Sequence, residues 1–197
     1  MKSPLNHLFV QAAVWLAAIN TFHQAATVAA QTSAAMEPLA IVTLSGYDEI
    51  LKDVKFVGSM AGQPQAVQQL EMMLQMFTQN KGLAGLDKTR PLGALVLSDG
   101  ADFQGVLCVP VTDSGALLEV LEPFGITAQD QGDGTQSLSV GGTRLFLRSQ
   151  GPWAYISPMP QSLQNLPDDP GTYFASLAKQ YDIGIRVMVQ NLSLIHI

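Results

Sequence analysis

The sequence is poor in residues that support redox, disulfide or metal chemistry. It contains one cysteine and three histidines among 197 residues. A single cysteine cannot form an internal disulfide. Because no basic residue stands close to Cys108 to activate its thiol, we expect this side chain to be a small buried residue of a strand.

Charged residues are also scarce, and they form no basic cluster. Asp, Glu, Lys and Arg make up 13% of the chain, with a formal net charge of −6. Nucleic acids and anionic membrane surfaces attract clusters of Lys and Arg, so the composition argues against both as partners. The thinly spread acidic charge favours solubility rather than a binding surface.

The first thirty residues have the pattern of a secretory signal peptide. Lys2 gives a positive start, Leu8–Ile19 is a largely apolar run, and Ala25–Ala30 supplies small residues. The apolar run is shorter than the roughly 18 residues that span a bilayer. We therefore expect cleavage after Ala30, or alternatively after Ala35, and export to the periplasm or the extracellular space, with no membrane attachment after cleavage.

The last six residues, Leu192–Ile197, read LSLIHI. This hexapeptide is the translation of CTG TCT CTT ATA CAC ATC, a transposon end sequence used in sequencing-library adapters. We interpret residues 192–197 as adapter read-through and expect the natural protein to continue past Asn191. Residues 31–191 then form a single domain, long enough to bury a core.

Histidine is absent from this predicted domain. His7 and His23 lie in the predicted signal peptide, and His196 lies in the terminal hexapeptide. Within residues 31–191, a Ser/His/Asp triad and most zinc sites are therefore excluded.

The segment Arg90–Val111 is expected to form the central hairpin of the fold. Leu92–Leu97 is a nearly continuous apolar run, and an Asp/Gly turn separates it from a second strand that begins at Phe103. An isolated hairpin is marginally stable in water. We therefore expect other elements to cover both of its faces.

The remaining elements follow from apolar periodicity and turn residues. The further predicted strands are Leu39–Leu44, Ile126–Ala128, Ser137–Val140, Arg144–Leu147, Trp153–Ser157 and Ile183–Gln190. The predicted helical segments are Tyr47–Met60, Pro64 to before Asn80, Ser114–Glu122, Ser162–Leu166 and Pro170–Gln180. Their predicted N-terminal caps include Ser45, Thr112 or Asp113, and Asp169. This order predicts an α+β fold, with an antiparallel or mixed sheet that contains a four-stranded meander and is packed by about four helices.

Four methionines, Met60, Met72, Met73 and Met76, stand at helical spacing. A copper site would require companion His or Cys residues, which this region lacks. We interpret these methionines as side chains that fill gaps in the core.

Several acidic residues are candidates for chemistry but also fit ordinary turns. Asp130 and Asp133 lack the alternation and the closing Glu of a calcium loop, so we expect a hairpin turn there. Asp99, Asp102 and Asp113 could converge as acid and base, although each stands where turn or cap chemistry accounts for it.

Two further motifs are weak. Ser176 and Lys179 have the Ser-x-x-Lys spacing of penicillin-binding enzymes, but the later elements of that family do not follow, so an exposed helix surface is expected. Gly141 and Gly142 mark a hairpin and lack the helix and lysine of a phosphate loop. We predict no catalytic, cofactor-binding or metal-binding residues and no cofactor.

Three stretches, RPLGALVLSDG, FQGVLCVPV and LAKQYDIGIRVMVQN, together resemble a group of uncharacterised signal-peptide-bearing secreted proteins of planctomycete bacteria. The resemblance covers nearly all of the predicted domain. It implies export and a longer natural chain, and it implies no activity and no site residues.

Three functions remain open. The first is a non-catalytic exported domain that binds a protein or an envelope component. The second is a carboxylate-dependent hydrolase that uses a pair such as Asp99 and Asp102. The third is a carrier of an apolar ligand, with the Met-rich helix and the strand of Trp153 and Tyr155 lining a cavity between helices and sheet.

Overall fold

A computed structural model describes residues 37–98 and 102–192 of the chain. The predicted signal peptide, Asp99 and residues 193–197 lie outside the described residues. The strands are β1 (Glu37–Leu44), β2 (Leu92–Ser98), β3 (Phe103–Pro110), β4 (Thr127–Asp130), β5 (Thr135–Val140), β6 (Thr143–Gln150), β7 (Trp153–Ser157) and β8 (Ile183–Val187). The α-helices are α2 (Tyr47–Met60), α3 (Ala66–Phe77), α4 (Ser114–Leu121), α5 (Gly171–Ala178) and α6 (Val189–Leu192), and two short 3₁₀ helices are η1 (Glu122–Phe124) and η2 (Pro160–Leu163).

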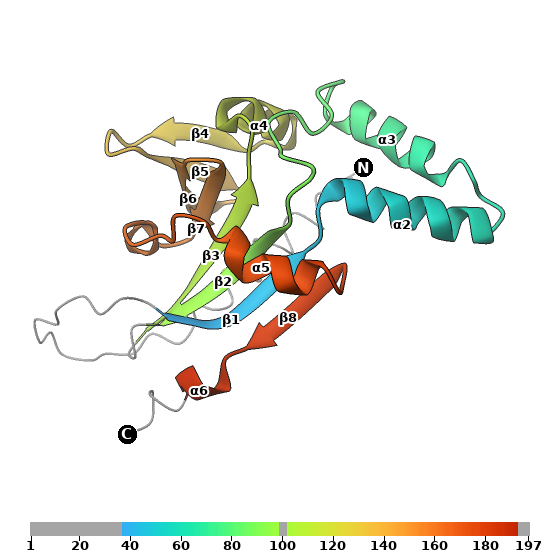
Figure 1. The fold of residues 1–197 in the computed structure, drawn as a ribbon. Coiled ribbons are helices and arrows are strands. Elements are labelled where there is room, and N and C mark those ends of the chain that lie inside the picture. The colour runs from blue at the N-terminus through green and yellow to red at the C-terminus, as the bar shows by residue number, and fades with distance from the viewer. Residues whose placement is uncertain (1–36, 99–101, 193–197) are drawn as a thin grey trace, which may run out of the picture.

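The strands form one antiparallel sheet in the order β4-β5-β6-β7-β3-β2-β1-β8 (Figure 1). The α+β class is confirmed. The whole sheet has eight strands and is therefore larger than a four-stranded meander, with β4 to β7 forming one half of it. Strands β4 to β7 follow one another, and β7 then pairs with β3, whereas β8 pairs with β1. These two pairings join segments far apart in the chain, which local periodicity cannot reveal.

One face of the sheet is covered over its middle strands by α5 and η2. Phe174 and Leu177 of α5 and Leu163 of η2 are buried against it, together with Trp153 of β7. The rings of Trp153 and Phe174 meet edge to face, with centroids 6.2 Å apart. A Cβ placed on Gly93 would lie 2.6 Å from Phe174 Cε1, so the ring rests on the bare backbone of β2. Figure 1 looks onto this face, with α5 lying across the middle of the sheet.

The opposite face is only half covered. Helix α4 packs over the β5 to β7 half, where Leu138, Leu145 and Ile156 are buried. The same face continues along one register row through the side chains of Ile156, Leu107, Ala94, Val42 and Ile185. At the β1 and β8 end of this row the side chains are exposed, so the described residues leave that half of the face without a cover. The expectation that both faces of the central hairpin are covered is therefore only partly confirmed.

Helices α2 and α3 pack on each other as a hairpin that projects from the sheet (Figure 1). Their turn depends on Gly58, where a Cβ would lie 3.0 Å from the Cβ of Ala66. Met60, Met72 and Met76 are 74%, 69% and 67% exposed, so their prediction as core residues is wrong. Helical spacing places these methionines on helix faces, but it does not determine what each face meets.

Two predicted helix caps have different outcomes. Asp113 Oδ1 accepts hydrogen bonds from the amides of Gly115 at 2.8 Å and Ala116 at 3.1 Å, which confirms it as the cap of α4. Ser45 does not cap α2, because its amide donates to the Asp182 carbonyl at 2.8 Å and its hydroxyl donates to Asp182 Oδ1 at 3.1 Å. These bonds extend the pairing of β1 with the segment that leads into β8. None of the described helices has the length and apolarity required to cross a membrane.

Candidate functional site

An apolar groove lies between α3, α4 and the half-covered face of the sheet. Its volume is about 440 Å³. The groove is lined by Leu70, Met73, Leu74 and Phe77 of α3, by Leu117, Val120 and Leu121 of α4, by Leu107, Val109, Leu138, Val140, Leu145 and Ile156 of the sheet, and by Thr78, Leu83, Leu86, Phe124 and Ile126 of the connections. We refer to this feature as the apolar groove.

The sequence of α3 directs its apolar side chains toward the groove. Leu70, Met73, Leu74 and Phe77 stand at positions i, i+3, i+4 and i+7, which lie on one face of a helix. No residue of α3 is buried, and the helix packs chiefly on α2. The wall formed by α3 is therefore held beside the sheet without closing onto it.

The segment after α3 is fixed to α4 at Gly85. Its φ angle is +81°, and a Cβ on this residue would overlap the backbone of Leu117. The Gly85 carbonyl also accepts from the Thr112 amide at 2.8 Å. Only glycine combines this backbone conformation with so close an approach. This contact sets the position of Leu83 and Leu86 at the end of the groove.

Among the residues that line the apolar groove, only Thr78 carries a polar side-chain group. Its hydroxyl donates to the Leu74 carbonyl at 2.7 Å and accepts from the Gly82 amide at 2.8 Å. The lining therefore supplies no acid, base or nucleophile, and it offers a ligand apolar contact alone. A molecule that fits this surface must itself be apolar where it enters the groove.

The prediction that Trp153 and Tyr155 line an apolar cavity is wrong, because they lie on the other face of their strand. Trp153 and Tyr155 lie on the opposite, packed face of β7, with less than 2% of each residue exposed. The Tyr155 hydroxyl donates to the Pro167 carbonyl at 2.5 Å, and burial raises the pKa of this phenol well above its ordinary value. The alternate residue Ile156 lines the groove instead, because successive side chains of a strand point to opposite faces.

A second hollow is a wide cleft at the start of α2. Its volume is about 780 Å³, and Ser45, Asp53, Lys179 and Asp182 are among its lining residues. A hydrogen bond with the Asp182 carboxylate is the main cause that raises the pKa of Asp53, followed by repulsion from the Asp182 charge. Two carboxyl groups close enough to share a hydrogen bond are nearer than a glycosidase acid and base, which stand roughly 5 to 10 Å apart. Asp53 is also exposed, so water competes with any proton transfer at this pair.

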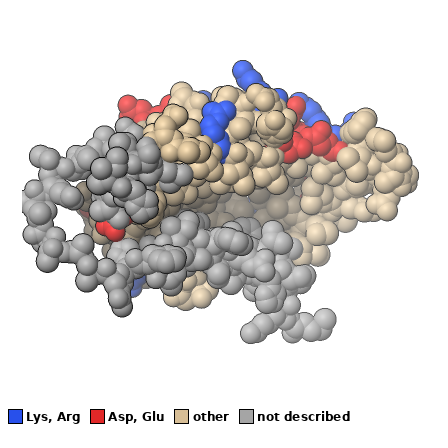
Figure 2. Space-filling view, turned by 90° about the horizontal axis from the view of Figure 1, so that it is seen from below, with Lys and Arg blue, Asp and Glu red and all other residues tan. Residues whose placement is uncertain are grey.

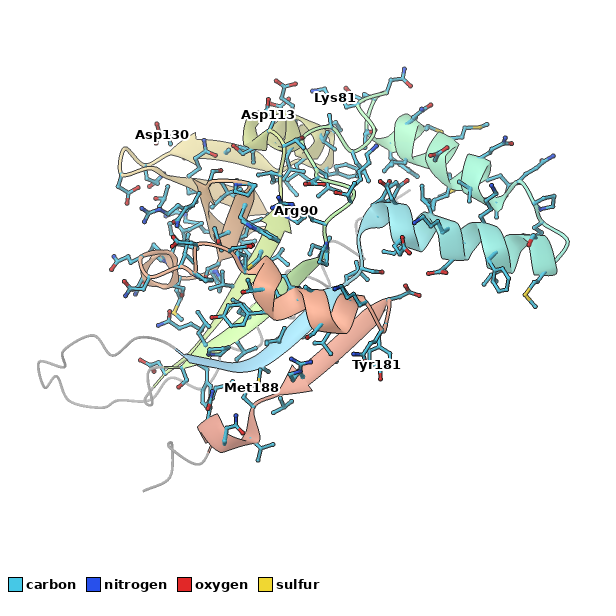
Figure 3. All side chains as sticks on the ribbon, in the orientation of Figure 1. Lys81, Arg90, Asp113, Asp130, Tyr181 and Met188 are labelled. Atoms are coloured by element: carbon cyan, nitrogen blue, oxygen red, sulfur yellow. The ribbon has the colours of Figure 1, made fainter. Side chains whose placement is uncertain are left out.

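The acidic residues predicted as a cluster do not converge within the described residues. Asp102 precedes β3 and Asp113 follows it, so the length of a strand of eight residues separates them. Asp99 lies outside the described residues. Asp130 Oδ1 accepts from the Gly132 amide at 2.9 Å, and Asp133 Oδ1 accepts from the Thr135 amide at 2.9 Å, which confirms their roles in the β4 to β5 turn. In Figure 3, Asp130 at this turn and Asp113 at α4 lie well apart.

The other candidate residues have structural roles. Cys108 is fully buried on β3, as predicted, and burial raises the pKa of its thiol to about 12. Ser176 and Lys179 are both exposed near the end of α5, where the Ser176 hydroxyl accepts from Arg186 at 3.1 Å. Across residues 37–98 and 102–192, no three His, Cys, Asp or Glu side chains are grouped so that they could hold a metal ion.

Sequence reasoning missed the Asp53 and Asp182 pair and most of the apolar groove. No motif marks the acidic pair, because 129 positions separate the two residues (182 − 53). The α3 stripe was visible as an amphipathic pattern, but its pairing with α4 depends on the connection through Gly85. A comparison of the chain with protein-family models, curated proteins and solved structures finds no match.

Proposed function

We propose that the domain is a non-catalytic exported binding protein, and that the apolar groove binds an apolar ligand with the chemistry of an acyl chain. The observation that supports this proposal most directly is the lining of the groove, in which the only polar side-chain group, that of Thr78, is already paired. The volume of about 440 Å³ is within the range of roughly 300 to 1,000 Å³ that is typical of small-molecule sites. Binding an acyl chain would join two of the functions that the sequence left open, since acyl chains belong to envelope lipids.

The position of the groove also supports the binding of a ligand rather than a gap left by poor packing of α3 on the sheet. Its α3 wall is half-buried to exposed, and Met73 is 47% exposed at the rim, so a ligand can enter from solvent. Its sheet wall is the well-packed half of the face, where Leu138 and Leu145 are buried. A rigid floor and an accessible helical wall suit the uptake of a flexible chain.

Titration with a fluorescent fatty acid such as cis-parinaric acid tests the proposal. We expect saturable binding to the wild-type chain. The Leu74→Glu variant places a carboxylate inside the groove and should weaken binding by at least about tenfold, because the ligand would have to desolvate that charge. Met72→Glu puts the same charge on α3 at a residue that is 69% exposed and outside the groove, so it should bind as the wild type does.

Two results would contradict this assignment. One is a wild-type chain that shows no saturable binding, and the other is a folded Leu74→Glu variant, checked by far-UV circular dichroism, that binds as tightly as Met72→Glu. Export has its own test, because N-terminal sequencing of the secreted protein should find residue 31 or residue 36 first. A secreted chain that retains Met1–Ala30 would contradict the cleavage.

A protein partner is the second candidate, and the exposed apolar side chains of the α2 and α3 hairpin favour it. Phe56 and Met60 are exposed one turn apart on α2, and Met72 and Met76 are exposed one turn apart on α3. Exposed apolar residues that gather on one element mark interaction surfaces. The Met72→Glu variant separates the candidates, since it leaves the groove intact and places a charge on this surface.

A further inference from the structure

Strand β8 ends the sheet with backbone groups that no described strand pairs with. At its two ends, the Asp182 carbonyl accepts from the Ser45 amide at 2.8 Å and the Met188 amide donates to the Leu39 carbonyl at 2.7 Å. The backbone groups of successive residues in a strand point alternately to its two sides. The residues whose N–H and C=O therefore point away from β1 are Ile183, Ile185 and Val187.

The same three residues also expose their side chains. Ile183, Ile185 and Val187 are 67%, 67% and 51% exposed, and all three lie on the half-covered face of the sheet. They carry no charge and no proline, the usual means by which natural proteins prevent an edge strand from pairing. Figure 2, a view from below Figure 1, shows that residues other than Lys, Arg, Asp and Glu make up most of the described surface visible from this side.

The other edge of the sheet differs. Strand β4 has four residues, TAQD, all of them exposed and most of them polar, and it ends in Asp130. A short edge strand that is polar and charged is protected against pairing with another chain. The contrast between the two edges indicates that β8 is the edge suited to strand addition.

We propose that β8 pairs with β8 of a second copy of this chain, antiparallel, about a two-fold axis at Ile185. Ile185 then faces Ile185 of the second copy, and Ile183 faces Val187. Each of these pairs exchanges two backbone hydrogen bonds, as outward-pointing residues of an antiparallel ladder do. Their apolar side chains meet on one face, where β-branched cross-strand pairs stabilise a sheet.

Two charged side chains at β8 also come close to those of the second copy under this symmetry. Asp182 and Arg186 lie at even positions, so their side chains point to the α5 face rather than to the face of Ile185. The two-fold axis places Arg186 of one copy directly opposite Gly184 of the other, so its diagonal neighbours are Asp182 and Arg186 of that copy. By symmetry the interface contains two diagonal Arg186–Asp182 pairs and one diagonal Arg186–Arg186 pair. The attractive pairs outnumber the repulsive one, and no like charges are directly opposed.

Light scattering coupled to size-exclusion chromatography tests the interface. We expect the wild-type chain to have twice its protomer mass at micromolar concentration. Ile185→Lys and Ile185→Glu each put like charges on the two-fold axis, so each variant alone should have the protomer mass. An equimolar mixture of the two variants should recover the doubled mass, because lysine then faces glutamate.

Val189→Lys serves as the matched control. Val189 is 71% exposed and follows β8, so its substitution adds the same charge nearby without entering the ladder. This variant should keep the doubled mass. Because Ile185 is 67% exposed, we expect its variants to keep the wild-type circular dichroism spectrum and melting temperature.

Three outcomes would overturn the proposal. They are a wild-type chain with the protomer mass at 100 μM, a folded Ile185→Lys variant that keeps the doubled mass, and a mixture of the two Ile185 variants that stays at the protomer mass.

Discussion

Truncation of Phe174 should show how strongly the packed face of the sheet stabilises the domain. Phe174 is a fully buried residue of α5 and lies between this helix and the sheet. Its ring meets Trp153 edge to face and rests on Gly93. Truncation of a buried Phe to Ala costs about 3 to 5 kcal/mol of unfolding free energy. For a domain of this size, each kcal/mol lowers the melting temperature by about 2 to 4 °C. A loss of about 4 kcal/mol should therefore lower it by about 8 to 16 °C.

Phe56→Ala is the matched control, because Phe56 is also helical but 64% exposed. Substitutions at such surfaces change stability by about 0.5 kcal/mol or less, so its melting temperature should move by less than about 2 °C. Thermal and urea unfolding followed by circular dichroism would measure both variants. Equal losses in Phe174→Ala and Phe56→Ala would refute the account of the core given above.

Gly93→Ala tests the same contact from the sheet side. The new methyl group would overlap the Val42 carbonyl oxygen of β1 and would lie 2.6 Å from Phe174 Cε1, so the ring or the strands must shift. Overpacking of this kind costs about 1 to 3 kcal/mol. A Gly93→Ala variant as stable as the wild type would show that neither β1 nor α5 lies as close to Gly93 as the structure indicates.

Three further predictions concern single side chains. Because burial raises the pKa of Cys108 to about 12, we expect a thiol reagent at pH 8 to label the native chain far more slowly than the chain in guanidinium, and equal rates would contradict the burial. Asp182 raises the pKa of Asp53, so the folded state favours the protonated form of Asp53. The stabilisation by protonated Asp53 is fully present below the unfolded pKa of about 3.9 and is lost as pH rises through the folded pKa. Asp53→Asn should therefore melt higher than the wild type at pH 7 but not at pH 3, and an identical pH profile would show that the pair does not form. Asp113→Ala removes the cap of α4 and should cost about 1 kcal/mol in urea unfolding, whereas an unchanged midpoint would show that water replaces the cap.

Local patterns determined much of the secondary structure. Apolar spacing predicted α2 with both of its observed ends, and β7 as well, because each is bounded by a clear change of period or by a turn residue. The role of Asp133 in its turn and the cap by Asp113 were also predictable, since both depend on contacts within a few residues. The burial of Cys108 followed from its place in an apolar strand.

Tertiary structure alone decided which predicted faces are covered. The methionines of α2 and α3 have the spacing of core residues, yet the hairpin projects from the sheet and leaves Met60 and Met72 exposed. The apolar groove exists because α3 stands beside α4, and the acidic pair exists because Asp53 and Asp182 meet across the fold.

The sequence by itself determined the α+β class and the alternation of Ile183, Ile185 and Val187 in β8. It could not show that β8 lies beside β1 at the end of an eight-stranded sheet. The spacing of apolar residues in the sequence predicts which side chains share a face, because that property depends on neighbouring residues only. Which faces and edges remain open depends on pairings between distant strands, and these are fixed only when the whole chain folds.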